Sequence, residues 1–231
     1  TIENSYHMFQ QNMLFRTHAV GNFGELLFAI IRDPAMIAYL NNNQSRKQHP
    51  NENLAREIME LFSLGIGAYS ERDIKEGARA LTGYTFNDDE FVFRQNDHDT
   101  GGKTILGQSG NFDGDGFVRV ILEQRVIARK LYKNFVADIE PLEATQNDKN
   151  LDPSMKRAID DLASTMLSAR YEIKPVLRRM FLSEHFYDAQ IRNQQIKSPV
   201  QLVVGAVRSL NTPVRDLSIL IDALDLMGQN L

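Results

Sequence analysis

Apolar residues recur every three or four positions along most of this chain, which is the spacing of one face of an α-helix. The opening segment shows the pattern clearly, because Tyr6, Phe9 and Met13 form one apolar stripe. The spacing returns after each break and dominates the C-terminal half of the chain. It predicts helices over residues 2–17, 23–31, 34–40, 52–64, 71–82, 117–122, 127–136, 155–167, 174–182, 199–210 and 217–227. The chain is therefore predicted to be all-α in class.

Short polar signals mark where several of these helices begin and end. Asn22 is a typical N-terminal cap, and Ser70 followed by Asp73 resembles a capping pair. Gly65 and Gly83 each follow a helix at the position where a left-handed residue is favoured. The two helices separated by Gly65 are predicted to form a helical hairpin. For the first of them, the apolar spacing predicts a buried face made of Leu54, Ile58, Leu61 and Phe62.

Only one short region has the alternation of a β-strand. Tyr84, Phe86, Phe91 and Phe93 alternate with polar residues, and a polar turn separates the two pairs. We therefore predict one small β-hairpin around residues 84–95. Residues 96–116 are rich in Gly, Asp, Asn and Ser and are predicted to be a loop.

The chain shows no internal repeat and no Pro- or Gly-rich linker of useful length. We predict a single helical domain over residues 1–231. Two lobes, 1–137 and 153–231, are the alternative, with residues 138–152 as their boundary.

Composition narrows the class of protein. The 26 basic and 30 acidic residues give a formal charge of −4, whereas proteins that bind nucleic acid typically carry an excess of positive charge. Nucleic acid is therefore not an expected partner. No apolar run approaches the ~20 residues of a membrane-spanning helix. Cysteine is absent, which excludes disulfides, thiolate metal sites and a cysteine nucleophile and leaves the compartment open.

A polar stripe on the helix over residues 52–64 is the first candidate for chemistry. At ~100° per residue, Asn53, Glu57 and Glu60 fall on one face with Arg56 beside them. Glu57 and Glu60 are candidate catalytic residues, and Asn53 and Arg56 are candidate ligand-binding residues. Two carboxylates at this spacing could bind a divalent cation or divide into an acid and a base. The alternative is structural: Glu52 and Glu60 each lie four residues from Arg56 and form ordinary helical ion pairs, while Glu57 binds donors of another helix.

A second candidate is the sequence His98-Asp99-Thr100-Gly101-Gly102-Lys103 in the predicted loop. It places an imidazole, a carboxylate and an ammonium beside two glycines, where backbone can approach a ligand closely. We interpret His98, Asp99 and Lys103 as candidate ligand-binding residues, with His98 also able to complete the polar stripe. The alternative is that His98 is hydrogen-bonded to the β-hairpin.

Asn111, Asp113 and Asp115 match the opening of a calcium-binding loop. The twelfth position, which should be Glu, is Leu122. A role for Asp113 or Asp115 as a helix cap is therefore favoured over calcium binding.

Residues 51–65 read Asn-Glu-Asn-Leu-Ala-Arg-Glu-Ile-Met-Glu-Leu-Phe-Ser-Leu-Gly, and this run closely resembles the signature helix of a bacterial family known as domain of unknown function 1800. Similarity covers nearly the whole chain, at Tyr69, Asp73 and residues 21–23, 33–36, 78–83, 98–99, 103–107 and 197–199. The resemblance implies an exported protein, often encoded beside a sulfatase-like family, with no established activity. In the family pattern, further segments precede and follow this region, so we expect a piece of a longer protein cut at both ends.

Three functions remain open from the sequence. The first is a non-catalytic extracytoplasmic binding or assembly module that works with a partner protein or a surface glycan, for which we expect exposed apolar surface near either end. The second is a hydrolase that uses Glu57, Glu60 and His98, with or without a divalent cation, for which we expect these three side chains to converge within ~5 Å. The third is a calcium-stabilised scaffold that rests on Asn111, Asp113 and Asp115.

Overall fold

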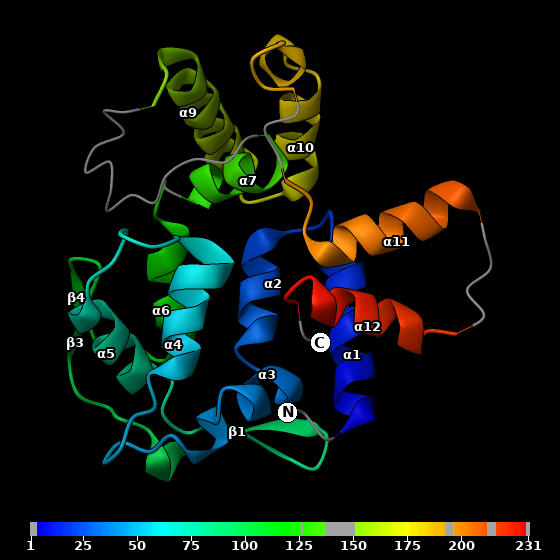
Figure 1. Cartoon of the computed structure of the whole chain (residues 1–231). Helices are drawn as coiled ribbons and strands as arrows, with labels where there is room; N and C mark the ends of the chain where they lie inside the picture. The colour runs from blue at the N-terminus through cyan, green and yellow to red at the C-terminus, as the bar shows by residue number, and fades with distance from the viewer. Residues whose placement is uncertain (1–3, 126, 137–150, 193–195, 212–215, 230–231) are drawn as a thin grey trace.

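Helices and two small antiparallel strand pairs make up the computed structural model, which describes residues 4–125, 127–136, 151–192, 196–211 and 216–229 (Figure 1). The predicted class, mainly helical with a small β-hairpin, is confirmed. Within the described ranges, no helix combines the length and apolar character that crossing a membrane requires.

The elements follow the predicted order closely. The N-terminal part contains α1 (Ser5–His18), α2 (Phe23–Ile30), α3 (Pro34–Tyr39), η1 (Asn42–Gln44), α4 (Asn53–Glu57), the π-helix η2 (Ile58–Ser63) and α5 (Glu71–Ala80). The middle contains β1 (Tyr84–Asn87), β2 (Glu90–Phe93), η3 (Gln95–Asp97), β3 (Lys103–Ile105), β4 (Gln108–Gly110) and α6 (Gly114–Leu122). The C-terminal part contains α7 (Ile127–Phe135), α9 (Pro153–Ser168), α10 (Ile173–Phe181), η4 (Glu184–Tyr187), α11 (Pro199–Leu210) and α12 (Ser218–Leu226).

Predicted caps explain several of these bounds. The Asn22 side chain accepts hydrogen bonds from the Gly24 and Glu25 amides in the first turn of α2. Ser70 and Asp73 form a reciprocal capping box at the start of α5, as the sequence predicts. Gly65 and Gly83 both adopt positive φ, +87° and +81°, which allows the chain to turn sharply after each helix.

The helix predicted over residues 52–64 changes type halfway along. After α4 the chain widens into a π-helix, in which the Leu64 amide donates to the Met59 carbonyl oxygen, five residues back, at 2.8 Å. The wider turn rotates the later side chains relative to an α-helix. Ile58, Met59 and Ser63 are buried, whereas Leu61 and Phe62 are 54% and 36% exposed. The predicted burial of Leu61 and Phe62 is therefore wrong.

Two strand pairs occur among the described residues, where the sequence predicts one. β1 pairs with β2 in the predicted region, with Tyr84 opposite Phe93 and Asn87 opposite Glu90. β3 and β4 form a second pair inside the predicted loop, joined by Leu106 and Gly107, both at positive φ. Strands of three residues are too short to produce a visible alternation, so prediction of a loop throughout residues 96–116 is wrong.

The core extends from α2 through α6 into α7, α9 and α10. Phe23 donates its amide to the Tyr171 carbonyl oxygen at 2.9 Å, and Ile173 donates to Gly21 at the same distance. These bonds join the turn before α2 to the turn between α9 and α10. The predicted boundary at 138–152 lies for the most part outside the described residues, but residues on its two sides share this core.

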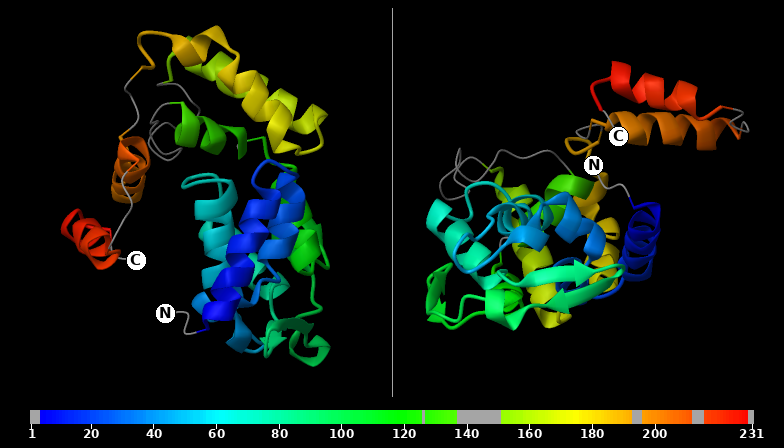
Figure 2. Two further views of the ribbon diagram at one scale, coloured as in Figure 1. Left: turned by 90° about the vertical axis from the view of Figure 1, so that its right-hand side faces the viewer. Right: turned by 90° about the horizontal axis from the view of Figure 1, so that it is seen from below.

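α11 and α12 pack against each other and stand apart from the bundle (Figure 2). Leu224 is the only described residue of either helix that is buried. In Figure 1 this helix pair overlaps α1 in projection, and the views of Figure 2 show that it stands away from α1.

Candidate functional site

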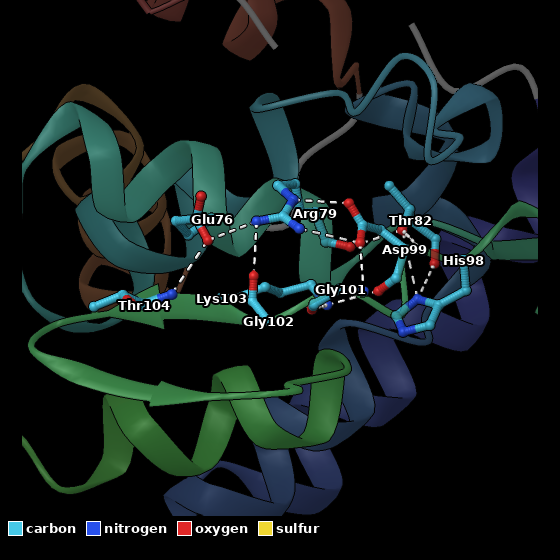
Figure 3. Close-up of polar contacts among 9 residues, drawn as sticks. All are labelled: Glu76, Arg79, Thr82, His98, Asp99, Gly101, Gly102, Lys103 and Thr104. Carbon is cyan, nitrogen blue, oxygen red and sulfur yellow. Dashed lines mark hydrogen bonds and ion pairs between the residues drawn. The ribbon is translucent and has the colours of Figure 1, made fainter.

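The loop that follows the first strand pair is held by a bidentate ion pair between Arg79 and Asp99 (Figure 3). Arg79 Nε donates to Asp99 Oδ2 at 2.7 Å, and Nη2 donates to Oδ1 at 3.1 Å. Arg79 Nη1 donates to Glu76 Oε2 at 2.8 Å and to the Gly102 carbonyl oxygen at 3.1 Å. The hydrogen bonds from Arg79 lower the pKa of Asp99, and those to Asp99 raise the pKa of Arg79.

Lys103 binds the same loop from inside. Its ammonium donates to the carbonyl oxygens of Asp99 at 2.6 Å and Gly101 at 3.0 Å. Burial lowers the pKa of Lys103, because a charge removed from water is less stable. The Lys103 side chain therefore folds back onto the preceding turn and holds its backbone in place.

His98 is buried beside the end of α5. Its Nδ1 donates to the Thr82 carbonyl oxygen at 2.8 Å, and its ring meets that of Phe93 edge-on with centroids 5.1 Å apart. Thr82 Oγ1 also accepts from the Asp99 amide at 2.8 Å. The structure thus brings His98, Asp99 and Lys103 together. Their hydrogen bonds are made to Thr82, Arg79 and the backbone of the loop itself. Glu76 and Arg79, which complete this network, carried only a weak signal: opposite charges three residues apart on a predicted helix.

The predicted polar stripe is divided among several partners. Arg56 pairs with Glu71 through two hydrogen bonds of 2.8 Å each and with Glu52 at 3.2 Å, which together raise the pKa of Arg56. Asn53 Nδ2 donates to the Leu40 carbonyl oxygen at 3.4 Å. These contacts tie α4 to the start of α5 and the end of α3.

Glu57 and Glu60 lie where the π-helix begins, close to α7. Glu60 Oε2 accepts from the Tyr69 hydroxyl at 2.7 Å, and Lys130 Nζ donates to the Glu60 carbonyl oxygen at 2.7 Å. Lys130 also interacts electrostatically with both carboxylates, while burial lowers its pKa. Glu57 Oε2 is buried and has no hydrogen-bond partner within the described part of the chain. Glu60 therefore contacts both Tyr69 and Lys130, and Glu57 interacts electrostatically with Lys130. His98 has a separate set of contacts.

The three calcium candidates have different roles in the described structure. Asp113 caps α6 by accepting from the Gly116 amide at 2.8 Å, as the favoured alternative predicts. Asp115 forms an ion pair with Arg32, whose guanidinium lies over the rings of Tyr84 and Phe91. Asn111 is exposed. Across the described ranges, no three His, Asp or Glu side chains are grouped closely enough to hold a metal ion.

α1 presents its apolar stripe to solvent. Tyr6, Phe9 and Met13 are 51%, 62% and 46% exposed. The buried side of the helix is polar: His7 Nε2 lies 3.0 Å from the Asp88 carbonyl oxygen at the tip of the first strand pair, and Gln11 Nε2 donates to Asp33 Oδ2 at 2.6 Å. We call Tyr6, Phe9 and Met13 the α1 stripe. It is an apolar face without a partner among the described elements.

The C-terminal helix pair exposes a larger apolar surface. Leu210 and Leu226 are 74% and 90% exposed. We use the name helix-pair surface for the exposed apolar side chains of α11, α12 and their ends: Leu202, Val204, Leu210, Leu217, Ile219, Ile221, Leu226 and Met227. Sequence reasoning predicted these helices but not which of their faces would lack a partner, because periodicity alone does not show what covers an apolar stripe.

These features define a class: a mainly helical protein with two short strand pairs, an internally satisfied polar loop, and apolar helix faces open to solvent. The chain belongs to the family described as Protein of unknown function (DUF1800), whose family model matches residues 2–231. Comparisons with curated proteins and with solved structures found no match.

Proposed function

We propose that this chain is a non-catalytic binding module that docks a partner protein through apolar helix faces. The observation that carries the proposal is the helix-pair surface, which is apolar, spread along both α11 and α12, and not covered by the described bundle. Monomeric soluble proteins rarely leave a large apolar surface in water, so such a surface marks an interaction site. The α1 stripe adds a second exposed apolar face.

The chemistry of these surfaces favours a protein over a glycan. Glycan recognition needs hydrogen-bonding groups that match hydroxyls, whereas the helix-pair surface consists of Leu, Ile, Val and Met side chains. Helix faces of this kind bind the complementary apolar face of another protein. We extend the proposal to an extracytoplasmic setting and a sulfatase-like partner, both of which rest on the family resemblance alone.

The polar sites give less support to a hydrolase. That hypothesis expects Glu57, Glu60 and His98 to converge, but His98 binds Thr82 while Glu60 binds Tyr69 and contacts Lys130. Contacts of this kind also hold neighbouring helices and loops together in proteins without catalytic activity, so they do not favour a hydrolase.

Site-specific photo-crosslinking in the producing cells tests the docking proposal. A photoreactive residue at position 226, on the helix-pair surface, is expected to give one discrete adduct with a second protein. The same residue at Ser209, which is exposed on α11 but polar, serves as the control. Adding Ile219→Gln should abolish the adduct from position 226. Equal labelling from both positions, or none from either, would overturn the proposal.

The same substitutions should leave the fold intact. Ile219 is 65% exposed, so Ile219→Gln is expected to change the free energy of unfolding by less than about 0.5 kcal/mol. Thermal unfolding followed by circular dichroism measures this. A large loss of stability would show instead that the helix pair packs against the rest of the chain in solution.

A further inference from the structure

A cavity of about 300 Å³ lies among α7, α9, α10 and η4, in the part of the molecule at the top of Figure 1. Part of its wall is apolar and is formed by Val136, Ala158, Leu162, Met180 and Phe186. Its volume is at the lower end of the range for small-molecule sites, and its mixture of apolar wall and few polar groups is typical of them.

Two polar side chains in the wall, Tyr132 and His185, are hydrogen-bonded to each other. The Tyr132 hydroxyl lies 2.6 Å from His185 Nε2, and the two rings stack with centroids 5.7 Å apart. Burial raises the pKa of Tyr132 to about 12, so its hydroxyl keeps its proton in neutral solution and can donate to Nε2.

The charged groups in the wall are two guanidinium groups and one carboxylate: Arg157, Arg179 and Asp161. Arg179 uses its Nε and Nη2 to bind both oxygens of Asp161, at 2.6 Å and 3.1 Å. Arg157 makes no hydrogen bond with any residue of the described structure, and its electrostatic interaction is with Asp152, whose carboxylate accepts from Ser154. Arg157 is exposed, and its guanidinium donors are therefore open to water or to a ligand in the cavity.

We propose that this cavity binds a small monocarboxylate with an apolar body. The apolar body would replace water against Leu162, Met180 and Phe186, and the carboxylate would accept hydrogen bonds from the forked donors of Arg157. An inorganic anion lacks the apolar part, and a neutral apolar molecule cannot form a charge-assisted hydrogen bond with Arg157. This site is separate from the docking surface, so neither proposal depends on the other.

Titration of the whole protein with hexanoate tests the proposal. With ¹³C-methyl methionine, the Met180 methyl resonance, assigned through Met180→Leu, reports on the cavity, and Met13 on the α1 stripe is the internal reference. Hexanoate is expected to shift Met180 saturably and leave Met13 unchanged. Hexanamide, which has the same size without charge, should bind roughly tenfold more weakly, because a charge-assisted hydrogen bond is replaced by a neutral one.

A matched pair of variants locates the charge. Arg157→Gln should weaken hexanoate binding roughly tenfold and remove the preference over hexanamide. Arg178→Gln removes the same charge from an exposed position on α10 that does not line the cavity, and should leave the affinity unchanged. No saturable shift at Met180, equal affinity for hexanamide, or equal weakening by both variants would overturn the proposal.

Discussion

Gly83 shows how one residue fixes the join between helix α5 and strand β1. It has a φ of +81°, and a Cβ built there would lie 2.6 Å from the Arg94 carbonyl oxygen. Both the left-handed backbone and the approach of the opposite strand therefore require glycine. The sequence predicted a helix-ending glycine here, but the contact with Arg94 depends on the tertiary fold.

Gly83→Ala is expected to destabilise the protein by more than about 1 kcal/mol, because the backbone must shift to relieve both constraints. Urea unfolding measures the change. Gly102→Ala is the control, since that glycine has ordinary φ and a Cβ added there would meet nothing within 4 Å. A Gly83→Ala protein as stable as the control would show that the turn can relax freely.

The Arg79–Asp99 pair makes stability depend on pH in a direction that can be worked out. The pKa of Asp99 is lowered in the folded protein by hydrogen bonds from Arg79. Its contribution to stability is thus fully present above the unfolded value of about 3.9 and is lost as the pH falls through the lower folded value. Asp99→Asn should remove that contribution.

The expected result is that wild type exceeds Asp99→Asn in stability most at neutral pH, and that the difference shrinks below about pH 4. Urea titrations from pH 7 to pH 2.5 would show this. A difference that grows on acidification would contradict the assigned role of Asp99.

In the π-helix, the burial of side chains differs most from what the sequence pattern predicts. An α-helical count places Ile58 and Leu61 on one buried face, but the wider turn buries Ile58 completely and leaves Leu61 54% exposed. Two nearby apolar positions in the same element should therefore respond very differently to truncation.

Ile58→Ala is expected to cost about 2–5 kcal/mol through loss of buried surface and a residual cavity. Leu61→Ala should cost less than about 0.5 kcal/mol, since its side chain is largely in water. Chemical denaturation of the two variants distinguishes the π-helix from a regular α-helix. Equal costs would mean that the helix is regular in solution.

Elements marked by local sequence features, such as helix-capping residues, could be predicted from the sequence. Elements that depend on contacts with distant parts of the chain could not. Asn22, Ser70 and Asp73 mark helix starts through their side-chain chemistry, and the structure shows each of them capping as expected. The β3–β4 pair depends instead on tertiary support: the Leu106 amide at its turn donates to Asp73 Oδ1 at 2.6 Å. Likewise, the partners of Glu60 come from residues 69 and 130, which no local pattern connects to it.

At the scale of the whole molecule, burial is unevenly distributed. α2 to α6 contribute many buried side chains, whereas α11 and α12 contribute only Leu224 among the described residues. Local stability follows buried contacts, so the C-terminal helix pair should open more readily than the bundle.

Hydrogen exchange at neutral pH is expected to show faster exchange for the amides of α11 and α12 than for those of α5 and α6. If the docking proposal holds, the purified partner should slow exchange in the helix pair and leave α5 unchanged. Strong protection of α11 and α12 in the isolated protein would contradict their lack of buried contacts.

The eight methionines divide by exposure: Met8, Met13 and Met227 are about 40% or more exposed, Met155 is half-buried, and Met36, Met59, Met166 and Met180 are buried. Peroxide oxidises accessible thioethers first, and each sulfoxide turns an apolar side chain into a polar one. Met13 and Met227 belong to the two apolar faces, and the chain has no cysteine to react before them. Mild oxidative stress would therefore make these faces more polar while the core stays chemically unchanged, and methionine sulfoxide reductases could restore them.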